Sequence, residues 1–220
     1  MALSLQEVRA GIAAEHEAFA ALLRELDDDA WARPTRCEGW TVADVAAHVS
    51  GSMAEIVAGE LEGQGTEPVT NRQVAQRRGH TRDELADELD GAAKASADLL
   101  AVFDDAAWAG PAPGGFDGTL GDAVEALWYD AYLHADDIRA AVGLPSAQGP
   151  GLKASLSHVA TVLGQRGWGP ATLALDGCDE FDVRAGGKRI EGDALAFVLA
   201  ATGRADPSTV GLGPDVNIYA

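Results

Sequence analysis

The sequence predicts an α+β protein in which an antiparallel four-helix bundle is followed by a small α+β domain. Three observations indicate this fold class. Helix-start signals recur through the first two thirds of the 220 residues, and each precedes apolar residues at helical spacing. A segment rich in glycine and proline then interrupts the pattern. Beyond it, short segments separated by glycine turns are typical of strands.

The helix-start signals share the pattern [ST]-x-x-[DE]. In such a capping box the hydroxyl accepts a hydrogen bond from an otherwise unpaired backbone N–H, and the acidic side chain reaches back toward the cap. One match is a weak signal, but four matches that each precede helical periodicity predict four helices. The pattern begins at Ser4, Thr41, Thr81 and Thr119.

The predicted helices each carry one apolar stripe that must be buried against the other helices, which favours an antiparallel bundle. They cover about 5–26, 42–58, 82–104 and 120–142. The connection at 59–80 is long and rich in glycine. A connection of this length is expected to cross over the bundle or to cover a site.

A linker at 144–151 separates the bundle, expected at residues 1–145, from a second domain, expected at residues 150–220. A helix is predicted directly after the linker, and a last helix at 192–204 is predicted to be capped by Asp193. The strands predicted between these helices cover 171–177, 180–187 and 188–192.

The charge of the chain excludes several classes of partner. It carries 16 basic and 35 acidic residues, a formal net charge of −19 at pH 7. Such a surface repels nucleic acids and anionic membranes. No apolar run is long enough to span a bilayer, and the N-terminal segment does not resemble a signal peptide. Cys37 and Cys178 do not suggest a disulfide framework, so they predict reduced thiols in a cytoplasmic protein.

The segment WYDAYLHADDIRAAVG at 128–143 places polar groups on the stripe that faces the core. Asp130 and His134 are four residues apart, so their side chains lie on one helix face. An ionised aspartate in an apolar interior is costly unless it is paired or binds a metal. His48 lies on the apolar side of the second helix, and facing helices can bring it to this pair. Two imidazoles and a carboxylate are a standard ligand set for a divalent metal.

The residues alone leave other interpretations open. Asp130 and His134 are also consistent with a salt-bridged pair at the edge of the bundle. His48 is also consistent with a core histidine bonded to a carbonyl oxygen. His16 lies on an apolar stripe as well, and it is expected in the core or at its rim, with a smaller chance of lining a pocket.

Three stretches resemble the mycothiol-dependent maleylpyruvate isomerase family, part of the DinB-like metal-binding superfamily. They are TRCEGWTVADVAAHV (35–49), DAYLHADDIRAAVG (130–143) and GDALAFVLAATGR (192–204). The resemblance covers the whole chain in order, a DinB-like bundle and then a sterol-carrier-like α+β domain. The first stretch fits the fairly specific pattern C-x-G-W-[ST]-x-x-x-[LV]-x-x-H.

The resemblance implies roles for individual residues. His48, Asp130 and His134 match the zinc ligands, although the family usually has glutamate where this chain has Asp130. Arg204 matches an arginine that the family uses for activity. An alternative for Arg204 is a basic residue that favours the dipole of the helix before it.

The long connection also contains basic residues that can bind an anionic substrate or a thiol cofactor. They are Arg72, Arg77 and Arg78, of which we assign Arg78 to cofactor binding. The alternative for these arginines is a solvated basic loop.

The resemblance implies an enzyme in which mycothiol, held as a thiolate at the metal, attacks an electrophilic small molecule. The outcome is isomerisation or S-transfer, in a monomer or homodimer. Two other functions remain open at this stage. One is a non-enzymatic module that binds an apolar small molecule, and the other is a hydrolase that uses metal-bound water.

Overall fold

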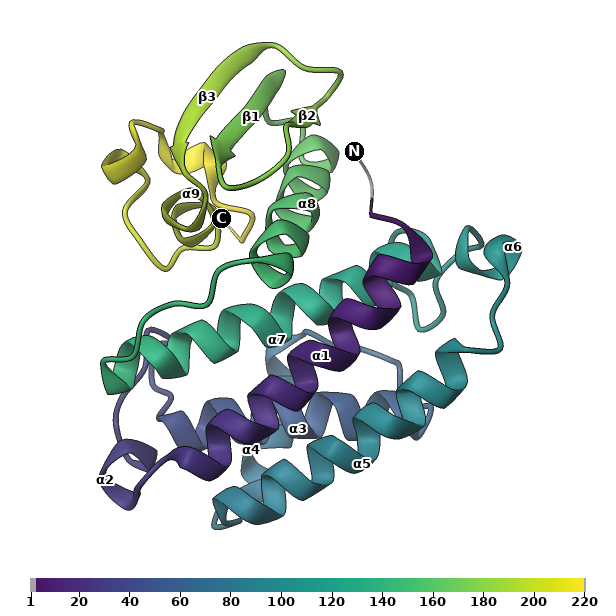
Figure 1. Cartoon of the computed structure of the whole chain (residues 1–220), viewed down its shortest axis with the longest axis vertical. Helices are drawn as coiled ribbons and strands as arrows, with labels where there is room; N and C mark the ends of the chain where they lie inside the picture. The colour runs from purple at the N-terminus through teal and green to yellow at the C-terminus, as the bar shows by residue number, and fades with distance from the viewer. Residues whose placement is uncertain (1–2, 220) are drawn as a thin grey trace. The chain divides into compact units, whose positions relative to one another are not determined.

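The computed structural model describes residues 3–219, which fall into two compact units (Figure 1). Residues 5–146 form the first unit, and residues 147–219 form most of the second. Helices make up most of the described chain, together with one small sheet, and this confirms the predicted α+β class. Among the described residues, no helix combines the length and the apolar character that crossing a membrane requires.

The first unit is the predicted helical bundle. Its long helices are α1 (Leu5–Glu25), α3 (Val42–Val57), α5 (Arg82–Leu100) and α7 (Leu120–Val142). All of their ends lie within about one helical turn of the predicted ends. Helix α1 packs against α5 and α7, and α3 packs against the same two helices. The helices therefore form a closed ring around one core, to which α1, α5 and α7 contribute fully buried side chains such as Phe19, Leu89 and Ile138.

Three of the predicted capping boxes are present, and the box at Thr119 fixes the start of α7. Its hydroxyl accepts from the backbone N–H of Asp122 at 3.1 Å, and the Asp122 carboxylate accepts from the N–H of Thr119 at 2.8 Å. Thr41 and Thr81 make equivalent boxes for α3 and α5. Helix α7 ends at Gly143, whose φ of 78° is left-handed and suits a residue without a side chain.

A further helix, α4 (Glu67–Arg77), forms inside the segment where the sequence suggested only a connection. It packs against α3 and carries the chain back along the bundle. As a result α3 and α5 run in the same direction in Figure 1, so the bundle departs from a simple antiparallel order. Short helices α2 (Asp28–Trp31) and α6 (Asp105–Trp108) lie in the other two connections.

The second unit is a small sheet that packs with two helices. The elements are α8 (Pro150–Gln165), β1 (Ala171–Asp176), β2 (Phe181–Val183), β3 (Lys188–Asp193) and α9 (Ala194–Ala201). The sheet order is β2-β1-β3, with β2 antiparallel and β3 parallel to the central strand. Alternate residues of β1 are buried, as expected for a sheet with one covered face. The Asp193 side chain accepts a hydrogen bond from the N–H of Ala196, which confirms the predicted cap of α9.

Two turns of 3-10 helix, η1 (Pro207–Val210) and η2 (Pro214–Val216), follow α9. They bring buried Val216 and Ile218 into this unit. The backbone N–H of Ile218 donates to the carbonyl of Ala201 at 2.8 Å, which ties the end of the chain to α9.

Candidate metal centre

Helices α3 and α7 bring together the three predicted metal ligands. The Nε2 atom of His48 lies 3.5 Å from one carboxylate oxygen of Asp130. The Nε2 atom of His134 lies 3.5 Å from the other oxygen. The two imidazole rings meet edge to face, with their centroids 5.1 Å apart. The aspartate therefore sits between two imidazole nitrogens, each facing a different oxygen.

The site is buried but not sealed. His48 and His134 are 5% and 8% exposed, whereas the side chain of Asp130 retains 35% of its accessible surface. Trp40, which precedes α3, lies against both imidazoles, with ring centroids 5.3 Å from His48 and 6.3 Å from His134. Asp130 is therefore the member of the group that faces solvent, while Trp40 packs against the two histidines.

The other nitrogen of each imidazole has a hydrogen-bond acceptor. His48 Nδ1 lies 2.9 Å from the amide oxygen of Gln73, and His134 Nδ1 lies 3.1 Å from the carboxylate of Asp137. An oxygen acceptor at Nδ1 stabilises the tautomer that carries its proton there. The lone pair of Nε2 is then free to bind a metal, and such partners are typical of metal-binding histidines.

Gln73 is itself held in place by a polar network that joins α4 to α3 and to the connection between them. It is fully buried, and its amide nitrogen donates to Glu55 at 2.8 Å and to Gln64 at 3.0 Å. Arg72 in turn forms an ion pair with Glu55 at 2.9 Å. These bonds orient the amide oxygen of Gln73 toward His48. The network is a part of the site that the sequence did not reveal, because a buried glutamine on a short polar helix leaves no periodic signal.

Asp137 is held in a similar way by the turn before α3. Arg36 donates to Asp137 at 3.0 Å and to the neighbouring Asp136 at 2.6 Å. The thiol of Cys37 donates to the oxygen of Asp137 that faces His134, at 3.2 Å. Both aspartates are almost fully buried.

The charges of the site are strongly coupled. Burial alone would raise the pKa of Asp130, but the two histidines outweigh it and hold that pKa well below its ordinary range. Burial would lower the pKa of His134, but the charge of Asp130 and hydrogen bonds to Asp130 and Asp137 raise it well above its ordinary value. The metal-free site therefore favours an ionised aspartate beside a protonated His134.

The donor geometry fits a divalent metal such as zinc. Two donors that each lie about 2.1 Å from a tetrahedral ion are separated by about 3.4 Å. The 3.5 Å spacings between Asp130 and each histidine match this separation, and all three donor atoms lie within 4.8 Å of one another. A second group, Cys37 with His134 and Asp137, also meets this distance limit. The Asp137 oxygen of that group already accepts from Cys37, so the first group is the better candidate for a metal site.

The predicted arginines occupy different places. Arg78 is exposed at the end of α4, whereas Arg72 pairs with Glu55 and Arg77 pairs with Glu88 at 2.7 Å. Arg204 follows α9 in the second unit, where it is partly buried. Its backbone N–H donates to the carbonyl of Leu199 at 2.8 Å. The structure thus brings together the three metal-ligand candidates, and Arg78 lies outside that group.

Comparison with known proteins gives a consistent result. Two solved structures resemble the chain over 96% of its length and 96% of theirs. One is a mycothiol-dependent maleylpyruvate isomerase, with a TM-score of 0.61 and 18% identity. The other is a histidine-to-alanine mutant of mycothiol-dependent maleylpyruvate isomerase, with a TM-score of 0.64 and 15% identity.

At such low identity these structures establish a shared fold. A comparison of the sequence with curated proteins finds no significant match. The family described as the mycothiol maleylpyruvate isomerase N-terminal domain matches residues 12–139, which is more than half of the chain and includes all three metal-ligand candidates. The chain therefore belongs to the mycothiol maleylpyruvate isomerase N-terminal domain family.

Proposed function

We propose that the protein is a metal-dependent isomerase that uses mycothiol as its thiol co-substrate. The observation that carries this proposal is the convergence of His48, Asp130 and His134, with both Nδ1 atoms already paired. Family membership supports mycothiol as the thiol. The few cysteines in the chain support a cytoplasmic location, where thiols stay reduced.

In this proposal His48, Asp130 and His134 hold the metal, which is zinc by the nature of its nitrogen and oxygen donors. A metal ion held by three protein ligands supplies positive charge that favours the thiolate form of a thiol at neutral pH. Gln73 and Asp137 keep the imidazoles oriented, with Nδ1 paired and Nε2 facing the position of the metal. Trp40 limits the access of water to the two histidines.

The reaction proposed for the thiolate is reversible addition to a cis double bond that is conjugated to a carbonyl group. A carbon–sulfur bond forms as the π bond breaks, the remaining single bond rotates, and the carbon–sulfur bond then breaks to give the trans isomer. The thiol is regenerated, so it acts catalytically. Release of the adduct before elimination would give S-transfer instead, which is the alternative outcome.

Two arginines complete the proposal. Arg204 binds a carboxylate of the substrate, supported by its match to an arginine that the family uses. Arg78, exposed at the end of α4, contributes positive charge for binding the thiol co-substrate. A guanidinium can bind a carboxylate with two hydrogen bonds. Substitution of either arginine by lysine should therefore restore only part of the binding affinity.

Metal analysis and a thiol-dependent assay test the proposal together. The purified protein should contain about one zinc ion per chain and should isomerise maleylpyruvate only when mycothiol is present. His48→Ala should lose both the metal and the activity. His80→Ala, which changes an exposed histidine before α5, is the matched control and should keep both. A metal-free wild type would contradict the metal site, and turnover without thiol would favour hydrolysis by metal-bound water.

A further inference from the structure

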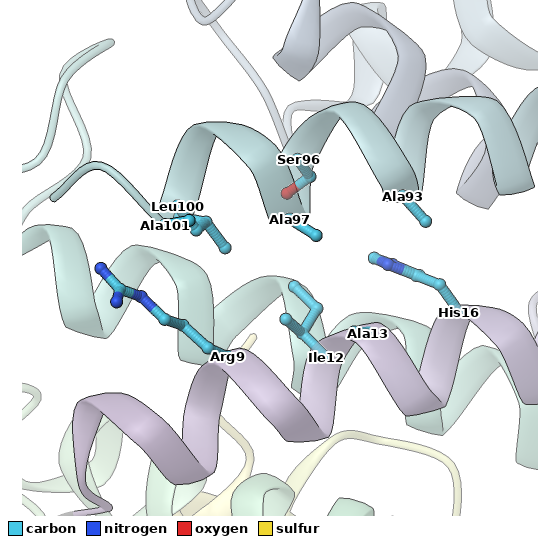
Figure 2. A pocket seen from close by; sticks show the side chains of 9 residues that line it. All are labelled: Arg9, Ile12, Ala13, His16, Ala93, Ser96, Ala97, Leu100 and Ala101. Carbon is cyan, nitrogen blue, oxygen red and sulfur yellow. The ribbon is translucent and has the colours of Figure 1, made fainter.

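The bundle contains a pocket between α1 and α5, lined by none of the three metal-ligand candidates (Figure 2). Its volume is about 180 Å³. The pocket exists because the inward stripe of α5 changes composition along the helix. Leu85 and Leu89 fill the core, but the next buried positions are Ala92 and Ser96, beside which Ala93 and Ala97 line the pocket. Small side chains on the facing helices leave space that larger side chains would fill.

Two buried polar side chains point into this pocket in Figure 2, His16 from α1 and Ser96 from α5. His16 is 3% exposed and Ser96 is 9% exposed. Within residues 3–219, neither side chain makes a hydrogen bond to another protein group, and neither is among the polar atoms that are sealed without a partner, so both are open to the pocket. Their partner is therefore expected to be a molecule in the pocket.

The chemistry of these two groups indicates what the occupant carries. Burial lowers the pKa of His16 to about 4, and the charge of Asp130 offsets this only in part, so the imidazole is neutral at neutral pH. A neutral imidazole and a hydroxyl each offer a donor and an acceptor but no charge. They suit a single uncharged hydroxyl group, which can donate to one of them and accept from the other.

The remaining walls indicate an apolar body of limited size. Ile12, Leu100 and the alanines of α5 supply aliphatic surface. A cavity of about 150 Å³ with such walls holds one benzene ring. Arg9 also borders the pocket, but its guanidinium donates to the carbonyl of Phe103 and lies over the ring of Trp108. Its Nε is buried without a partner in the described residues, but Figure 2 shows its guanidinium at the opposite end of the pocket from His16, so the group that meets His16 does not have to be an anion.

We propose that this pocket binds a small, uncharged molecule of the phenol class, with its ring between Ile12 and the alanines and its hydroxyl at His16 and Ser96. The alanines at the rim, Ala13 and Ala97, are exposed and leave a path from solvent. The site is additional to the metal centre, and the proposal does not depend on the chemistry proposed there.

Titration of the full-length protein with phenol, benzene and benzoate tests the proposal. Phenol should bind and shift the NMR signals of the Ile12 and Leu100 methyl groups through its ring current. Benzene should bind about threefold to tenfold more weakly, because it lacks the hydroxyl that pairs with the two polar groups. Benzoate should bind more weakly than phenol, because His16 and Ser96 offer no charge to its carboxylate. Tighter binding of benzoate would show that Arg9 selects an anion and would overturn the proposal. Failure of phenol to shift these methyl signals at millimolar concentration would show that the pocket holds water only and would overturn the proposal.

Substitutions on α5 locate the binding. Ala97→Leu fills the pocket and should abolish phenol binding, whereas Ala95→Leu places the same side chain on an exposed position outside the pocket and should leave it intact. Ser96→Ala should weaken phenol about threefold to tenfold and leave benzene unchanged. If Ala97→Leu does not fold by circular dichroism, Ala93→Leu replaces it. Phenol affinity that survives the filled pocket would contradict the proposed site.

Discussion

The carboxylate of Asp137 serves three residues at once. One oxygen faces His134 and also accepts from the thiol of Cys37, and the other accepts from Arg36. Because the carboxylate is fully buried, loss of its charge leaves the guanidinium of Arg36 with Asp136 as its remaining counter-charge. Asp137 therefore couples the turn before α3 to the orientation of a metal-ligand candidate.

Asp137→Asn should weaken zinc binding about tenfold to a hundredfold, the usual effect of changing a hydrogen-bond partner of a metal-binding histidine. The amide is similar in shape but is a poorer acceptor for the imidazole N–H. Competition with a fluorescent chelator measures the affinity. The control is Asp98→Asn, a change at an exposed position of α5. Equal affinities for the two variants would show that Asp137 does not orient His134.

His16 makes the stability of the bundle sensitive to acid. Its pKa is lowered from 6.5 to about 4 in the folded protein, so the unfolded chain binds more protons between these values. Stability is therefore complete above pH 6.5 and falls as the pH drops toward 4, by about 3 kcal/mol for this group alone. His16→Gln should show a smaller loss between pH 7 and pH 5 in urea unfolding. The carboxylates titrate in both proteins, so the difference between the two isolates His16.

At the scale of elements, glycines decide how closely the helices approach. Gly11 on α1 faces the indole of Trp128 on α7, and a methyl group there would lie only 2.0 Å from the ring. Trp128 is 2% exposed, so its ring has no room to move away. The close contact of these helices therefore depends on the absence of a side chain at position 11.

Gly11→Ala should destabilise the protein by about 1–3 kcal/mol or more, because the added methyl overpacks the contact between α1 and α7. Gly91→Ala is the matched control, since Gly91 is also inside a long helix but has no atom within 4 Å of the added methyl. This change should stabilise by about 0.5–1 kcal/mol through helix propensity. Chemical denaturation measures both, and effects of the same sign would contradict this account of the packing.

The elements that the sequence predicted well have strong local signals. The capping boxes at Thr41, Thr81 and Thr119 and the long apolar stripes located the main helices to within about a turn. Helix α4 was missed because only Gln73 and Val74 are buried along it, so it shows almost no periodic apolar pattern. Its stability comes from tertiary contacts, such as the ion pair between Arg77 and Glu88.

The residues of the candidate site also fall into those with a local sequence signal and those without one. His48, Asp130 and His134 lie on apolar stripes, where a polar residue stands out, and the predicted convergence is what the distances show. Gln73 and Arg36 act through contacts between residues far apart in sequence, and no local pattern marks them. The roles of Arg204 and Arg78 and the domain boundaries at 145 and 150 stay predictions.

For the molecule as a whole, the candidate metal centre and the small sheet belong to different units of the chain. All three metal-ligand candidates, together with Gln73 and Asp137, belong to the unit formed by residues 5–146. Each unit has its own buried apolar residues, with Phe19 in the first and Phe197 in the second. Units with separate cores can unfold in separate steps.

Calorimetry of the full chain should therefore show that zinc raises the midpoint of one unfolding transition and leaves the other unchanged. A ligand that binds only the folded state stabilises it by about 2.7 kcal/mol at one hundred times its dissociation constant. Addition of a chelator should reverse the shift. Two transitions that respond equally to zinc would mean that both units unfold together or that both bind the ion.

The spacing of the site along the chain has a consequence for biosynthesis. His48 is on α3, whereas the other two ligand candidates are on α7, near the end of the bundle. A nascent chain that has emerged only as far as α5 has one of the three ligand candidates, His48. If the group binds a metal as proposed, loading with the ion waits until α7 has left the ribosome and docked, and metal acquisition then marks a completed bundle.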